Sequence, residues 1–197
     1  MTRLSICLVI QFLVLGSALH AANFVFNTDP FGAADPNDNV RQIVNVQVPI
    51  NFDPATDVIL FDPALVGFSN ISFANDFSAN LPTTGLNAVV VLDQPAAAGS
   101  AHTAIANQIT SSGPGFFIYF NTTLDLPRLV FARDLGDPNA DIALLARMVN
   151  LTGDLPAMQN FTAANFAPMP EPSTALLISG GLLTAVLVRR RRCLKRG

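Results

Sequence analysis

The sequence predicts an α+β fold rich in β-strands: a mostly antiparallel sheet or sandwich with one mid-chain helix and two C-terminal helices. Three observations predict it. Short apolar or alternating segments recur up to residue 133, separated by turns rich in Pro, Gly and Asn. Segments with helix-like starts occur only after residue 99. Fourteen of the 15 Phe residues lie within residues 23–167 and no Trp does, which indicates a packed core.

Strands account for the first half of this region. The clearest is expected over residues 41–50, where Val44, Val46, Val48 and Ile50 face one way and polar residues or proline the other. A loop rich in Asp, Asn and Pro precedes it over residues 29–39. The other strands are expected over residues 23–27, 57–61, 70–74 and 86–93.

The second half is predicted to combine helices with one hairpin. Ser100 can cap a helix over residues 101–110. Residues 116–121 and 128–133 are expected to pair as a β-hairpin. Asp137 is then expected to cap a helix that has Pro138 at its first position. Its core face would contain Ile142, Leu144, Leu145, Met148 and Val149, and a second short helix is expected over residues 156–165.

Charge in the middle of the chain excludes one class of partner. Between Asp29 and Asp154 there are thirteen Asp residues and four Arg, a formal net charge of −9, with no Lys and no Glu. Nucleic-acid binding depends on basic side chains that neutralise phosphates. We therefore expect no nucleic-acid partner.

The N-terminal segment has the pattern of a secretory signal peptide. Arg3 precedes an apolar run over residues 4–16, and small residues follow near Ala21 and Ala22. We assign residues 1–22 to the signal peptide and expect cleavage after Ala21 or Ala22. The implied partners are the Sec translocon and signal peptidase.

The C-terminal segment combines a membrane span with a sorting motif. An apolar run over residues 175–188 follows Pro170, Glu171 and Pro172, and Arg189, Arg190, Arg191 and Arg192 come directly after it. The run is short for a bilayer, although arginine side chains can reach outward from its end. By the positive-inside rule, the arginines place the C-terminus in the cytoplasm and the preceding body outside.

This tail, residues 168–197, resembles the PEP-CTERM sorting signal of Gram-negative and related bacteria. The resemblance rests on the order Pro170-Glu171-Pro172, apolar span, arginine cluster, and covers only about the last 28 residues. It implies recognition by an exosortase, a membrane transpeptidase-like enzyme, and transfer of the body from the inner membrane to the envelope or the medium. The resemblance also implies an association with exopolysaccharide.

Residues 81–85 (LPTTG) match the Gram-positive sortase motif, but they lie about 90 residues before the terminal span. A turn between two strands explains them.

The body, residues 23–167, carries few groups suited to catalysis. Both cysteines, Cys7 and Cys193, fall in the segments expected to be removed. His102 is its one histidine and is expected at the surface, in the first turn of a helix. We therefore expect no enzyme and no bound cofactor. A secreted enzyme acting on surface polysaccharide is the alternative.

Calcium is the one cation that the sequence brings into question. Asp35, Asn37 and Asn39 provide oxygen ligands at positions 1, 3 and 5 of a candidate calcium loop, as do Asp137, Asn139 and Asp141. Both segments lack the glycine at position 6 and the glutamate at position 12 of an EF-hand calcium loop. A turn explains the first loop and a helix cap the second.

Together these patterns predict an exported, non-catalytic protein of the cell envelope or extracellular matrix, sorted by an exosortase-type system and associated with exopolysaccharide or the cell surface.

Overall fold

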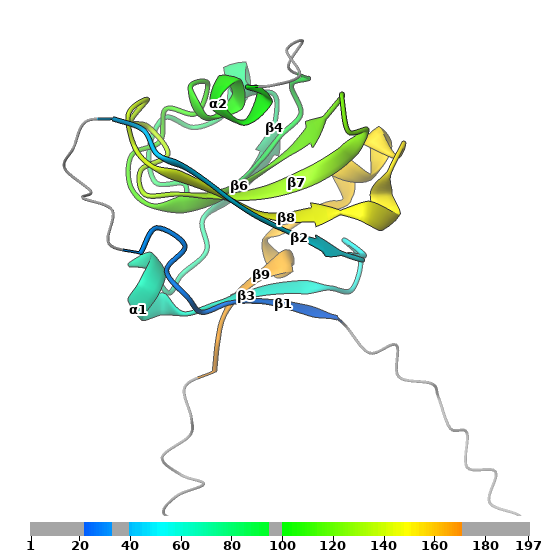
Figure 1. Cartoon of the computed structure of the whole chain (residues 1–197), viewed down its shortest axis with the longest axis horizontal. Helices are drawn as coiled ribbons and strands as arrows, with labels where there is room; N and C mark the ends of the chain where they lie inside the picture. The colour runs from blue at the N-terminus through cyan, green and yellow to red at the C-terminus, as the bar shows by residue number, and fades with distance from the viewer. Residues whose placement is uncertain (1–21, 33–39, 95–99, 171–197) are drawn as a thin grey trace, which may run out of the picture.

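Two β-sheets of unequal size lie one above the other in the computed structural model, with helix α2 on the outer side of the larger sheet (Figure 1). The structure describes residues 22–32, 40–94 and 100–170. The strands are β1 (Asn23–Phe26), β2 (Ile43–Ile50), β3 (Val58–Phe61), β4 (Phe73–Asp76), β5 (Ala88–Val91), β6 (Gly115–Asn121), β7 (Leu126–Ala132), β8 (Ile142–Met148) and β9 (Phe166–Pro168). The helices are α1 (Pro63–Val66), α2 (Ala101–Ala106) and the 3-10 turns η1 (Ser78–Asn80), η2 (Val149–Leu151), η3 (Leu155–Asn160) and η4 (Ala163–Asn165).

The prediction of a β-rich α+β fold is confirmed, but the expected mostly antiparallel pairing is wrong. The small sheet has the order β1-β3-β9, and both of its pairs are parallel. The large sheet has the order β2-β8-β7-β6-β5-β4, and only β6–β7 and β7–β8 are antiparallel. Parallel neighbours arise because the connections cross over: the chain between β5 and β6 passes through α2, as in a β-α-β unit.

Two apolar cores pack on opposite faces of the large sheet. The larger core joins the small sheet to the large one and is rich in phenylalanine, including Phe26, Phe61, Phe116 and Phe166. The smaller core lies on the other face of the large sheet, where Ile105 of α2 contributes with Phe117 and Tyr119 of β6. Most of the phenylalanines are thus core residues, as the sequence indicated.

The segment after Asp137 is the largest error in secondary structure, because the expected helix is strand β8. This strand lies between β2 and β7 and is covered on both faces, so nearly all its residues are buried. A strand buried on both sides is apolar throughout and lacks the alternation that identifies a strand in sequence. Asp137 closes a turn by accepting a hydrogen bond from the backbone N–H of Asn139 at 2.8 Å.

The alternation over residues 41–50 is also interrupted. The pairing of β2 with β8 shifts register between Asn45 and Val48, and Gln47 has a φ of 50°. This β-bulge leaves Val46 and Val48 half-exposed. The valines therefore do not share one face, as the sequence had suggested.

The remaining predictions are confirmed in part. The mid-chain helix exists as α2, although it is shorter than expected, and 3-10 turns replace the last helix. Residues 81–85 lie in the connection between β4 and β5. The final strand continues to Pro168, and the backbone N–H of Met169 donates to the carbonyl of Phe61 at 2.8 Å.

Candidate functional site

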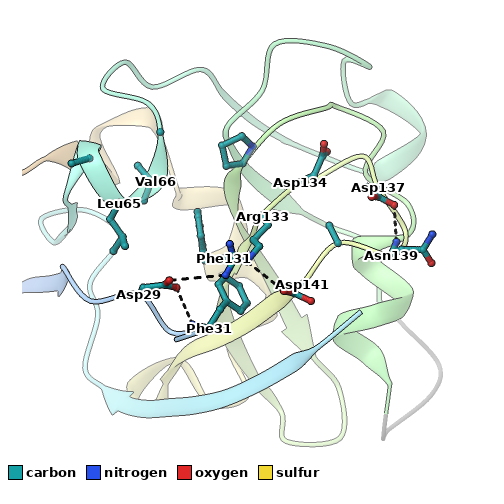
Figure 2. Close-up of a pocket in the computed structure, with 14 residues that line it drawn as sticks. Asp29, Phe31, Leu65, Val66, Phe131, Arg133, Asp134, Asp137, Asn139 and Asp141 are labelled. Atoms are coloured by element: carbon teal, nitrogen blue, oxygen red, sulfur yellow. Dashed lines mark hydrogen bonds and ion pairs between the residues drawn. The ribbon is translucent and has the colours of Figure 1, made fainter. Parts of the chain in front are cut away.

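A pocket of about 640 Å³ lies at one end of the two sheets. Its walls come from the loop after β1, from α1, from the end of β7 and from the β7–β8 loop (Figure 2). Four aspartates (Asp29, Asp134, Asp137 and Asp141) line it together with one cation, Arg133.

Arg133 is the centre of the pocket's electrostatics. Its guanidinium carbon lies 4.5 Å from the centre of the Phe31 ring, a cation–π contact. The guanidinium also pairs with Asp141 at 3.4 Å and with Asp29 at 4.0 Å (Figure 2). These contacts hold an aromatic ring, a cation and two carboxylates in one fixed arrangement.

The other carboxylates of the pocket shape its loops. Asp134 accepts hydrogen bonds from the backbone N–H groups of Gly113 and Gly136, both at 2.9 Å. Asp141 is buried and accepts from the backbone N–H of Gln42 at 2.8 Å. Each of these carboxylates therefore ties two segments of the chain together at the pocket.

The rim of the pocket is polar and open to solvent. Asp137 and Asn139 are exposed there, with the half-exposed Ala140 beside them. Arg41 braces this loop, because its guanidinium donates to the carbonyls of Ala140 and Asp137 at 3.0 and 3.1 Å. The rim thus presents acceptors and an amide on a supported loop.

The predicted site residues fall in different places. Of the sorting motif, Pro170 is exposed just after β9, whereas Glu171, Pro172 and Arg189–Arg192 lie outside the described residues. The first calcium candidate, Asp35 with Asn37 and Asn39, also lies outside them. In the second, Asp137 and Asn139 are on the rim, but Asp141 turns to Arg133.

Metal and membrane features were also sought in the described residues. Across residues 22–32, 40–94 and 100–170, no three His, Cys, Asp or Glu side chains are grouped to hold a metal ion. No helix in those same ranges has the length and apolar character to cross a bilayer. The expected span over residues 175–188 is outside them.

His102 corrects one expectation about the body. It was expected at the surface, but it lies on the buried side of helix α2 and is only 8% exposed. Among the residues that the structure describes, its Nε2 has no hydrogen-bond partner. Burial lowers the pKa of His102, and the positive charges of Arg128 and Arg41 lower it further.

Arg133 and Phe31 were not singled out by the sequence. They lie about a hundred residues apart and meet only through the tertiary fold. The available signal was Arg133 itself, one of only four basic residues in the strongly acidic middle of the chain.

No family model matches this chain, and comparisons with curated proteins and with solved structures give no match either.

Proposed function

We propose that this chain is an exported cell-envelope or matrix protein, sorted by an exosortase-type system, whose body is a non-catalytic module that binds exopolysaccharide. A signal peptide over residues 1–22 and a membrane span over residues 175–188 would flank that body. The resemblance of the tail to PEP-CTERM signals supports the sorting step. So does the exposure of Pro170 immediately after the last strand, because a membrane enzyme needs access to the motif.

The pocket around Arg133 carries the binding part of the proposal. Sugar hydroxyls both donate and accept hydrogen bonds, and the rim offers the carboxylate of Asp137 and the amide of Asn139. Both are exposed on a loop that Arg41 supports. The ring of Phe31 below Arg133 adds an apolar surface. Ligand sites combine apolar walls and a few fixed polar groups in this way.

The same geometry favours binding over hydrolysis. A glycosidase needs one carboxyl that keeps its proton and a second that is charged. In this pocket Asp29 and Asp141 pair with Arg133, and Asp134 accepts two backbone N–H bonds. Asp137 likewise accepts from the backbone N–H of Asn139. Every carboxylate of the pocket is thus engaged in a structural contact, which favours a binding role.

Co-sedimentation of the full-length protein with exopolysaccharide tests the binding step. We expect Asn139→Ala to weaken binding by about threefold to tenfold, the loss of one or two hydrogen bonds. Asn70→Ala, at an exposed asparagine outside the pocket, is the matched control and should bind normally. Equal binding by both variants would overturn the pocket assignment. Release of short oligosaccharides would support the secreted-enzyme alternative instead.

The C-terminal mass of the surface-located protein tests the sorting step. We expect the mature chain to end near Pro170-Glu171-Pro172. Replacing the arginines 189–192 should block processing and leave the full-length chain in the inner membrane, because the span loses its orientation signal. Surface protein that still ends at Gly197 would refute sorting and indicate a permanent tail anchor.

A further inference from the structure

Asp57 is a buried carboxylate at the start of β3, and its partners are unusual. The residue is 6% exposed. Its Oδ1 accepts from the backbone N–H of Ala22 at 2.8 Å and from the hydroxyl of Thr56 at 3.1 Å, and its Oδ2 accepts from the N–H of Asp53 at 2.8 Å. Within the described ranges both ion pairs involve Arg133, so Asp57 has no cationic side chain beside it. Burying a carboxylate is costly when no positive charge compensates it.

The backbone holds Ala22 in place from its other side. The carbonyl of Ala22 accepts from the N–H of Val58 at 3.2 Å, and the next residue, Asn23, is the register partner of Val58. Ala22 therefore continues the β1–β3 pairing, and that pairing directs its nitrogen at Asp57.

We infer that signal peptidase cuts between Ala21 and Ala22 and that the new α-ammonium of Ala22 forms an ion pair with Asp57. This inference rests on the proposed export. Water would add across the peptide bond, leaving a carboxylate on Ala21 and the nitrogen of Ala22 as an ammonium. The nitrogen need not move, because it already lies 2.8 Å from Asp57. Cleavage after Ala22 would instead remove Ala22 from the body, and Asp57 would lose the hydrogen bond from its backbone nitrogen.

The chain offers a direct probe of this pair. Lys195 is its single lysine, so in the body the α-amine is the one group that amine-acylating reagents modify. An amine held as a paired ammonium acylates slowly, because the neutral form reacts. We expect the exported protein to begin at Ala22 and its α-amine to react at least about tenfold more slowly when folded than in urea, as a charge-assisted bond implies.

The variants and outcomes separate this inference from export itself. Asp57→Asn should raise the folded-state rate toward the urea rate, whereas Asp53→Asn, at an exposed neighbour, should not. The wild-type comparison stands even where a variant fails to fold. A first residue other than Ala22, or equal rates in the two solvents, would overturn the inference. An exported chain with residues 1–21 still attached would instead overturn the proposed signal peptide.

A second, independent observation concerns two arginines on the face of the large sheet that α2 covers. Arg128 of β7 and Arg147 of β8 are direct cross-strand partners, where like charges repel. Arg128 is only 7% exposed, and its two hydrogen bonds go to neutral oxygens, those of Tyr119 and Gln47. The side chain of Arg147, which is partly exposed, makes no ion pair or hydrogen bond among the described residues, and the Nε atoms of both arginines are buried without an acceptor there.

Two neighbouring groups strengthen this observation. Gln47 reaches Arg128 from the bulge in β2, where its φ of 50° is strained for a residue other than glycine. His102 on α2 is buried, its Nε2 has no partner within the described ranges, and the two charged side chains that act on it there, Arg128 and Arg41, are both positive. The buried guanidinium of Arg128, with Arg147 beside it and no counter-charge among the described residues, is costly unless something neutralises it.

We propose that Arg128 and Arg147 bind an oxyanion, either a carboxylate or a phosphate group. The planar guanidinium matches both groups, and the terminal N–H groups of Arg147, on a partly exposed side chain, provide the hydrogen bonds beside the charge of Arg128. The anion supplies the negative charge that Arg128 and Arg147 lack. The two ion-paired aspartates of the described residues engage Arg133 instead.

Calorimetric titration of the full-length protein in mild detergent tests this site, with inorganic phosphate and glucuronate as separate probes. We expect at least one to bind with a dissociation constant of about 1 mM or lower and the comparison between them to identify the preferred class. Arg147→Gln should weaken binding at least about tenfold and should fold, because Arg147 has no partner to lose. Arg196→Gln, which removes one positive charge outside the body, is the charge-matched control and should bind the anion normally. Absence of binding by both anions, or equal affinity in Arg147→Gln, would overturn the proposal.

Discussion

His102 couples the stability of the body to pH through its burial. Burial, with Arg128 and Arg41 nearby, lowers its pKa in the folded state below the usual value near 6.5. As pH falls through that value, the unfolded chain takes up the proton first, so the free energy of unfolding decreases until the lower folded-state pKa is reached. Above pH 6.5 both states are neutral and the effect vanishes.

We therefore expect the urea midpoint of the wild type to fall between about pH 6.5 and 5 by more than that of His102→Gln. The difference between the two proteins isolates His102, because the aspartates are common to both. Parallel pH profiles would contradict this prediction.

Gly115 illustrates a different constraint at the scale of one residue. A Cβ atom here would lie 2.5 Å from Leu135 Cδ1 and 2.8 Å from the carbonyl oxygen of Asn87. Because backbone cannot yield as a flexible side chain does, we expect Gly115→Ala to lower the free energy of unfolding by about 1–3 kcal/mol. Urea denaturation measures this, with Ser69→Ala at an exposed position as a near-neutral control.

Single residues also show where sequence reasoning stops. The oxygen-rich segment from Asp137 to Asp141 drew notice in the sequence only as a weak calcium loop explained by a helix cap, whereas in the structure it lines the candidate pocket. Its chemistry depends on Arg133 and Phe31, which no local pattern links to it. The ion pair between Asp29 and Arg133 joins residues about a hundred positions apart, so the tertiary fold alone could reveal it.

At the scale of elements, β9 is short but completes the small sheet as one of its two edge strands. Phe166 is 3% exposed, and its ring centre lies 5.9 Å from that of Phe116 on the large sheet. We expect Phe166→Ala to reduce the free energy of unfolding by about 3–5 kcal/mol, since the change leaves a cavity between the sheets.

Truncation tests the same strand without altering a core side chain. A chain that ends after Met169 keeps β9 and should unfold cooperatively, whereas one that ends after Asn165 loses the strand and its core residue. Circular dichroism during heating distinguishes the two. Equal melting curves would show that the small sheet does not need β9.

Secondary structure was predictable from the sequence where two strands that pair are also consecutive in the chain and joined by a short turn. The β6–β7 hairpin was found correctly because its strands are joined by a short polar connection. Strand β8 was mistaken for a helix because it is buried on both faces, and the bulge at Gln47 left no mark in the alternating pattern. Parallel pairing could not be foreseen either, because distant segments, not adjacent ones, become neighbours.

At the scale of the whole molecule, the body contains no cysteine, so no disulfide contributes to its stability. Cys7 and Cys193 are the two cysteines of the chain, and both precede or follow the described ranges. The two apolar cores must therefore stabilise the body without a disulfide. We expect the melting temperature of the processed protein to be the same with and without dithiothreitol. A shift on reduction would contradict both the processing and this assignment.

The small sheet collects strands from the start, the middle and the end of the body, since β1, β3 and β9 begin at residues 23, 58 and 166. Pairing of such distant segments is slow, because a long loop must close before any contact rewards it. A chain emerging from a ribosome or a membrane channel cannot finish this sheet until Phe166 has emerged. The body would thus stay incompletely folded while it is threaded and become resistant to proteases only after β9 emerges.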